Sequence, residues 1–236
     1  MNFIFRPPSM EDFIRLLQAW RFWVIGALIG GLAGAGFYAI FPPEYQAHAT
    51  VAVSFNMEKA WPNKPDNELF YYLDRESRKV EEIAWSDLTL QTVTDQTGLD
   101  AAALRAGKLE LSQPEDGGWH FYASDPSPII AEKLASAWAE AFTSQVQQGL
   151  LVEVELDAAR KALIQSPDDA KLKAEIGSLE AKSLAITPEL QISISHSKNL
   201  SAERKTNLAT YILAGSALFL ALAGLGILFF GDRKSA

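Results

Sequence analysis

The feature that most constrains the fold is residues 22–41, FWVIGALIGGLAGAGFYAIF, a run of 20 residues without a charged side chain. As a helix rising about 1.5 Å per residue, it would span roughly 30 Å, the thickness of the hydrocarbon core of a bilayer. A second charge-free run, LATYILAGSALFLALAGLGILFF, occupies residues 208–230. The two runs predict transmembrane helices that flank a domain formed by residues 42–207.

The first run has an alternative interpretation as part of a cleaved signal peptide. Small residues stand at cleavage spacing at 33–35 and again at 47–49. However, the apolar core of a signal peptide is usually about 7–15 residues long. The length of the run therefore favours a helix that stays in the membrane.

The distribution of positive charge predicts how the chain is oriented. Arg6, Arg15 and Arg21 precede the first run, and no Lys or Arg follows it until Lys59. By the positive-inside rule, the segment 1–21 is expected on the cytoplasmic side. With two spans, the tail 231–236 also returns to the cytoplasm, so the middle of the chain would be exported.

Composition excludes several classes of function. Residues 42–207 carry 16 Lys and Arg against 26 Asp and Glu, and this negative balance argues against a nucleic-acid partner. The chain has no cysteine, which excludes disulfides, thiol catalysis and Cys-type zinc sites. His48, His120 and His196 are expected far apart on three strands, and no GxSxG, HExxH or GxxxxGK[ST] motif occurs. We therefore expect neither metal nor cofactor, and a protein that is not an enzyme.

The middle of the chain predicts an α+β domain. Alternating apolar residues indicate strands at 45–55 and 190–195, and a hairpin of strands at 108–112 and 119–124 across a Pro and Gly turn. Residues 56–66 are expected to form a loop. Helical spacing indicates helices at 67–85, from Ser86 to Gly98, from 128 to 165, and at 168–186, the last ended by Pro188. The last two helices predict an antiparallel helical hairpin, about 128–186, that protrudes from an α/β base.

The transmembrane segments carry small residues at helical spacing. Gly26, Gly30 and Gly34 form two overlapping GxxxG pairs, and the second segment offers Gly215 and Ala223. Because small residues let helix backbones approach closely, we expect these five positions to form an oligomer interface in the membrane. The alternative is that glycine is simply frequent in membrane helices.

Three stretches resemble the polysaccharide co-polymerases, the bacterial chain-length determinant (Wzz-like) family. They are FPPEYQAHATVAV at 41–53, EEIAWSDLTLQTVTDQTGL at 81–99 and HFYASDPSPIIAEKLASAWAEAF at 120–142. The resemblance implies a two-pass protein of the bacterial inner membrane, with both termini cytoplasmic and the central domain periplasmic. It also implies a ring-like homo-oligomer that works with a polysaccharide polymerase or export machinery on O-antigen, capsule or exopolysaccharide.

The chain departs from this family in three respects. Many relatives have a proline-rich segment before the last helix, but 193–210 has no proline, which argues against the usual contact between the two membrane helices. The exported helix is short for the family, so a tall bell-shaped assembly is not expected. The tail 231–236 has no nucleotide-binding loop and no tyrosine cluster, which excludes a fused tyrosine kinase.

These observations predict a protein that regulates the chain length or export of a surface polysaccharide. Trp119, Tyr122 and Trp138 are candidates for contact with a glycan or partner, although aromatic residues in such positions are more often part of a core. One alternative is an adaptor that activates a separate cytoplasmic tyrosine kinase through 1–21 and 231–236. Others are an extracytoplasmic sensor or ligand-binding domain and a membrane scaffold unrelated to glycans.

Overall fold

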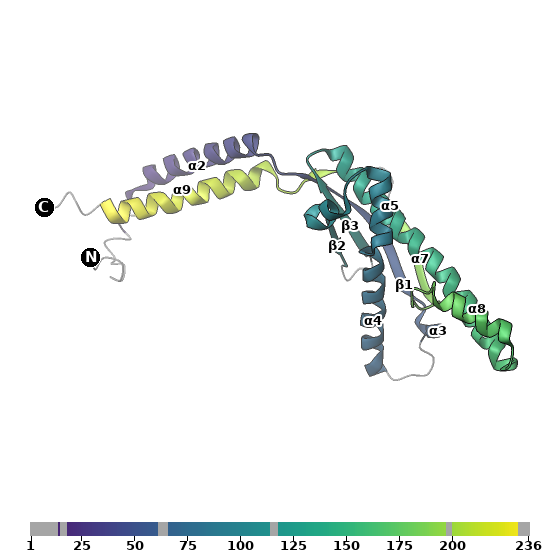
Figure 1. Ribbon diagram of the computed structural model, residues 1–236. Helices are drawn as coiled ribbons and strands as arrows, with labels where there is room; N and C mark the ends of the chain where they lie inside the picture. The colour runs from purple at the N-terminus through teal and green to yellow at the C-terminus, as the bar shows by residue number, and fades with distance from the viewer. Residues whose placement is uncertain (1–13, 15–17, 61–65, 114–117, 197–199, 231–236) are drawn as a thin grey trace. The chain divides into compact units, whose positions relative to one another are not determined.

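The computed structural model describes residue 14 and residues 18–60, 66–113, 118–196 and 200–230 (Figure 1). These residues form two compact units. One contains the apolar helices that precede Pro43 and follow Arg204, and the other runs from Glu44 to Glu203 and mixes helix with sheet. Most of the segment 1–21 and the whole tail 231–236 lie outside the described residues.

The first unit is a pair of apolar helices, α2 (Trp20–Ile40) and α9 (Leu208–Phe230), which lie side by side (Figure 1). Both are long and apolar enough to cross a membrane. Their large side chains are largely uncovered, with Leu32 exposed by 74% and Leu213 by 69%. Apolar side chains exposed all around a helix pair are unfavourable in water but favourable in hydrocarbon. This pattern agrees with the expectation of two membrane-crossing helices.

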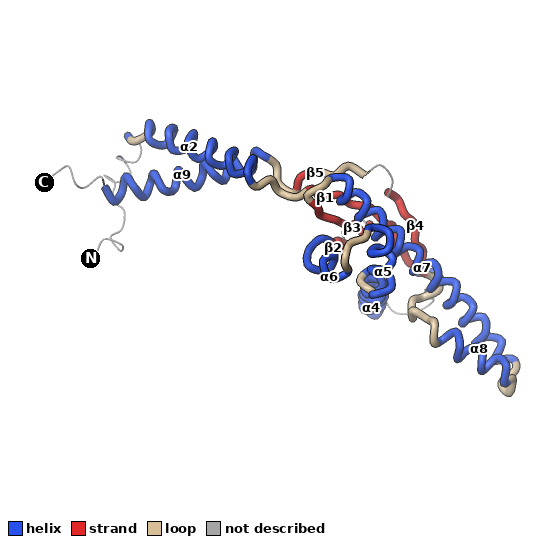
Figure 2. Tube along the Cα trace, turned by 45° about the horizontal axis from the view of Figure 1, so that its top comes forward, coloured by secondary structure: helices blue, strands red, loops and turns tan. Residues whose placement is uncertain are grey.

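The second unit, which we call the α/β unit, is built on an antiparallel sheet (Figure 2). Its main strands are β1 (Tyr45–Phe55), β2 (Leu109–Ser112), β3 (Gly118–Asp125) and β4 (Leu190–His196), in the order β2-β3-β1-β4. A fifth strand of two residues, β5 (Glu203–Arg204), pairs with β1. The strand predicted at 45–55 and the predicted hairpin are confirmed. β1 alternates as its sequence requires, since Ala47, Ala49 and Val51 are buried on one face.

Helical segments of different lengths connect β1 to β2. They are α3 (Met57–Ala60), α4 (Asp66–Ala84), α5 (Asp87–Thr97), α6 (Ala101–Ala103) and one further helical turn, η1 (Leu104–Lys108). α3 falls where a loop was expected, and α6 and η1 were not predicted. The bounds of α5 follow the sequence signals: the Ser86 hydroxyl accepts the Thr89 N–H at 3.3 Å, and Gly98 ends the helix with φ of 75°.

The hydrophobic core lies between the sheet and α7 (Pro128–Gln165), a single helix of 38 residues that packs on β1, β3 and β4. Leu134, Trp138, Phe142 and Val146 recur every four residues along α7 and are fully buried. The Trp138 indole N–H donates to the Ala84 carbonyl oxygen at 2.8 Å. This bond joins the end of α4 to the centre of the core.

The second half of α7 forms a hairpin with α8 (Ala170–Glu180), as predicted (Figure 2). A small separate cluster of Leu156, Ala159 and Leu179 holds the two helices together. The predicted end of the second helix is wrong, because α8 stops at Glu180 rather than at 186. The following residues run without helix back along α7, where Leu184 fills the space beside Gly149. The burial of this extended segment against α7 outweighs the helical spacing of its sequence.

Candidate functional site: a charged pocket at the root of the helical hairpin

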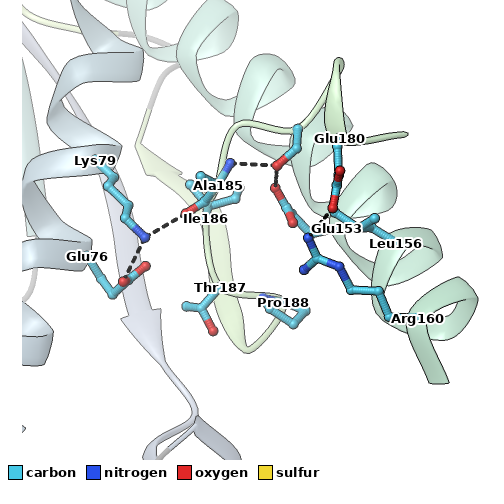
Figure 3. A pocket seen from close by; sticks show the side chains of 11 residues that line it. Glu76, Lys79, Glu153, Leu156, Arg160, Glu180, Ala185, Ile186, Thr187 and Pro188 are labelled. Atoms are coloured by element: carbon cyan, nitrogen blue, oxygen red, sulfur yellow. Dashed lines mark hydrogen bonds and ion pairs between the residues drawn. The ribbon is translucent and has the colours of Figure 1, made fainter. Parts of the chain in front are cut away.

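A pocket of about 360 Å³ opens within the α/β unit where the hairpin begins (Figure 3). Its walls come from three helices and from the extended segment 183–188. α4 contributes Glu76 and Lys79, α7 contributes Glu153, Leu156 and Arg160, α8 contributes Glu180, and the extended segment contributes Ser183, Ala185, Ile186, Thr187 and Pro188. The site therefore joins parts of the chain that are about a hundred residues apart.

One wall is an ion pair within α4, whose lysine also donates a hydrogen bond to the extended segment. The Glu76 side chain is only 3% exposed, and its Oε1 accepts hydrogen bonds from Lys79 Nζ at 2.9 Å and Arg75 Nε at 3.3 Å. Lys79 Nζ also donates to the Ala185 carbonyl oxygen at 2.7 Å (Figure 3). Lys79 is thus engaged on both sides and ties α4 to the extended segment.

Ala185 adopts an unusual backbone conformation in this wall. Its φ is 54°, which costs a residue with a Cβ about 1–2 kcal/mol. Two hydrogen bonds hold it there: its N–H donates to the Ser183 hydroxyl at 2.9 Å, and its carbonyl receives Lys79. The turn is therefore fixed by side chains that also line the pocket.

The opposite wall contains a buried carboxylate, Glu153, on α7. The residue is 8% exposed. Its Oε1 accepts a hydrogen bond from the Ser183 hydroxyl (Figure 3). The ion pairs among the described residues do not include Glu153. Buried carboxylates are normally paired with a cation, and Glu153 is an exception to this rule.

The rim of the pocket carries a more exposed ion pair. Arg160 donates to Glu180 Oε1 at 2.7 Å, and both side chains are about half exposed. Nearby on α4, burial raises the pKa of the Tyr72 phenol, while its hydrogen bond with Thr187 acts in the opposite direction. The pocket thus offers both donors and acceptors, as polar ligands require.

The five predicted interface positions of the apolar helices lie at the contact between α2 and α9 of the same chain. A Cβ added at Gly30 would overlap the Gly215 carbonyl, and one at Gly34 would overlap the Tyr211 carbonyl. A Cβ at Gly26 would stand 3.6 Å from the Ala223 Cβ, and Ser216 Oγ donates to the Ala27 carbonyl at 2.9 Å. The missing proline segment argued against this contact, but α2 and α9 pack together without it. Whether these helices also meet a second copy stays a prediction.

Two of the three aromatic candidates for glycan contact are part of the core. Trp138 is fully buried, and Trp119 is 5% exposed and stacks on Phe142 with ring centroids 5.8 Å apart. Their faces are therefore closed to a ligand, and proposing them as contact residues was wrong for this reason. Only Tyr122 is half-buried on the other face of the sheet.

The sequence predicted that the histidines stand far apart, and this prediction is wrong for His48 and His120. The rings of His48 and His120 are 5.4 Å apart, and that of Tyr122 is 5.2 Å from His48. Thr50 Oγ1 lies 2.9 Å from His120 Nδ1. In the backbone register, Thr50 pairs with His120 on one side and with His196 on the other. No group of three or more metal-ligating side chains forms among the described residues, however.

The sequence analysis missed the pocket, although one signal for it was present. The buried face of α7 continues from Phe142 and Val146 through Gly149 to Glu153 at helical spacing. An acidic residue in phase with a buried face marks a polar site in the interior. The two segments expected to contact a separate kinase, 1–21 and 231–236, lie almost entirely outside the described residues.

No model of a known protein family matches the chain, and no curated protein matches it.

Proposed function

We propose that this chain is a two-pass protein of the bacterial inner membrane that assembles into a ring-like homo-oligomer and regulates the chain length or export of a surface polysaccharide. The central domain would be periplasmic and both termini cytoplasmic. The protein would act without catalysis, as a partner of the polysaccharide polymerase or export machinery.

One observation carries the proposal: the order of the elements along the chain. An apolar helix leads into β1, a helical hairpin follows β3, and β4 returns beside β1 and leads to a second apolar helix. α2 and α9 pack together through glycines, so one chain supplies a complete helix pair. This plan agrees with the family that the sequence stretches resemble, and it supports a scaffold rather than an enzyme.

The first experiment measures the mass of the full chain in nanodiscs by native mass spectrometry. A discrete multiple of the 25.9 kDa chain, on the order of six copies or more, is the expected result. A monomer or dimer that persists in mild lipid conditions would contradict the ring.

The second experiment compares glycan lengths on gels from the parent bacterium, a deletion strain and complemented strains. Deletion should broaden or shift the length distribution, and the wild-type gene should restore it. A Gly30→Val chain should fail to restore it, whereas Gly36→Val should succeed, because a Cβ at Gly36 meets nothing within 4 Å. An unchanged distribution after deletion would overturn the proposal.

The pocket favours a second candidate, an extracytoplasmic ligand-binding or sensor domain. A cavity of about 360 Å³ lies at the lower end of the range for small-molecule sites, about 300–1,000 Å³. This candidate would be preferred if the chain is monomeric in lipid and binds a small molecule.

A further inference from the structure

We infer that the pocket at the root of the hairpin binds a small hydrophilic amine, of the amino-sugar class, and that Glu153 receives its ammonium group. The inference rests on the pocket alone and does not depend on the polysaccharide proposal. It would hold for a protein of either candidate function.

The first step is the missing counter-charge. Glu153 is 8% exposed and, within the part of the chain that the structure describes, has a single hydrogen bond, from the neutral Ser183 hydroxyl. The other buried carboxylate of the pocket, Glu76, already has Lys79 and Arg75 beside it. A buried carboxylate without a cation is costly. A cationic group that enters the pocket would therefore be bound at Glu153 in preference to Glu76.

The second step concerns the kind of cation. A metal ion takes several protein ligands, and the described residues hold no group of three or more side chains that could supply them. An ammonium group needs only hydrogen-bond acceptors, and it donates three hydrogen bonds. The Glu153 carboxylate lines the pocket as such an acceptor, whereas the Thr187 hydroxyl is already hydrogen-bonded to Glu189. The chemistry of the lining thus fits an organic ammonium rather than a metal ion.

The third step concerns the rest of the ligand. The pocket contains two ion pairs, Lys79 with Glu76 and Arg160 with Glu180, and polar residues outnumber apolar ones in its lining. Hydroxyl groups can donate to one member of such a pair and accept from the other. An apolar body would displace water from these groups without replacing its hydrogen bonds, whereas the hydroxyls of a polyhydroxy amine would replace them.

The test is isothermal titration of the full chain in nanodiscs with glucosamine, and with glucose and N-acetylglucosamine as uncharged analogues. Saturable binding of glucosamine is expected, with at least about tenfold weaker binding of both analogues. Glu153→Gln should weaken glucosamine binding by about tenfold or more. Glu155→Gln, at an exposed position of the same helix, should leave it unchanged.

A measurement on the wild-type chain keeps the inference testable if Glu153→Gln does not fold. Glucosamine should slow amide hydrogen exchange in the segment 183–188, and glucose should not. The inference is overturned if glucosamine does not bind, if glucose binds equally well, or if Glu153→Gln binds like the wild type. None of these outcomes bears on the mass or glycan-length experiments, so the two proposals fail independently.

Discussion

The two units of the chain achieve close packing in opposite ways. In the helix pair, the contact between α2 and α9 forms where side chains are missing, at Gly30, Gly34 and Gly215. In the α/β unit, the core forms around the largest side chains, with Trp138 and Phe121 fully buried and their rings 4.8 Å apart. The difference predicts that added side-chain volume destabilises the contact between α2 and α9. Removed side-chain volume should instead destabilise the core of the α/β unit.

The largest effect is expected from Trp138→Ala in the α/β unit. The change leaves a cavity and an unpaired Ala84 carbonyl, and should lower the free energy of unfolding by about 3–5 kcal/mol. Urea-dependent proteolysis of the full chain in nanodiscs measures this. Phe70→Ala, at a side chain that is 73% exposed, is the control and should stay within about 0.5 kcal/mol. Equal losses in both variants would show that Trp138 does not organise the core.

The next effect tests the helix pair by adding volume. The chain has no cysteine, and a Cβ added at Gly26 would lie 3.6 Å from the Ala223 Cβ. This distance suits a disulfide, so a Gly26→Cys, Ala223→Cys chain should cross-link. Adding Gly30→Val should slow cross-linking by roughly tenfold, because the new side chain overlaps Gly215. Gly36→Val is the matched control, and a similar slowing there would contradict a contact specific to Gly30.

A smaller effect compares one hydroxyl in each unit. Ser86 caps α5, so Ser86→Ala should cost about 1 kcal/mol in the urea assay, well below Trp138→Ala. Ser216 donates to the Ala27 carbonyl across the helix pair, where such a bond contributes about 0.6 kcal/mol. Ser216→Ala should therefore slow cross-linking less than Gly30→Val. If Ser216→Ala slowed it more, the hydroxyl rather than the glycine face would hold the pair together.

The smallest effect is a pH dependence confined to the α/β unit. Burial raises the pKa of Tyr72 above the ordinary value of 10.0, so the folded state binds this proton more tightly than the unfolded state. The resulting stability is present below pH 10.0 and is lost as the pH rises through the folded pKa. Tyr72→Phe should flatten the fall in stability above that pH in the urea assay. Tyr71→Phe, at a side chain that is 75% exposed, should keep the wild-type slope.

Local signals predicted most of the elements. The alternation of Val51, Val53 and Phe55 identified β1, and Ser86 with Gly98 identified both ends of α5. These signals are informative because they depend only on neighbouring residues and on the period of the element, which is 2 residues in a strand and 3.6 residues in a helix. The ends of the two apolar helices were predicted within two residues because the charge-free runs are also a local feature of the sequence.

The site could not be predicted in the same way, because it depends on contacts between residues that are far apart in the sequence. The segment 183–188 is extended since Leu184 and Ile186 pack at Gly149, 35 or more residues earlier. The ring cluster of His48 and His120 arises only from the register of β1 with β3. Trp138 and Trp119 could be assigned to the core only once the positions of α7 and the sheet were known.

The split between the two apolar clusters has a consequence for how such a chain can diverge. The hairpin cluster of Leu156, Ala159 and Leu179 is separate from the core around Trp138. Insertions or deletions of matching helical turns in α7 and α8, beyond this cluster, would lengthen or shorten the hairpin without repacking the core. Natural selection can therefore change the length of the hairpin independently of the stability of the core of the α/β unit.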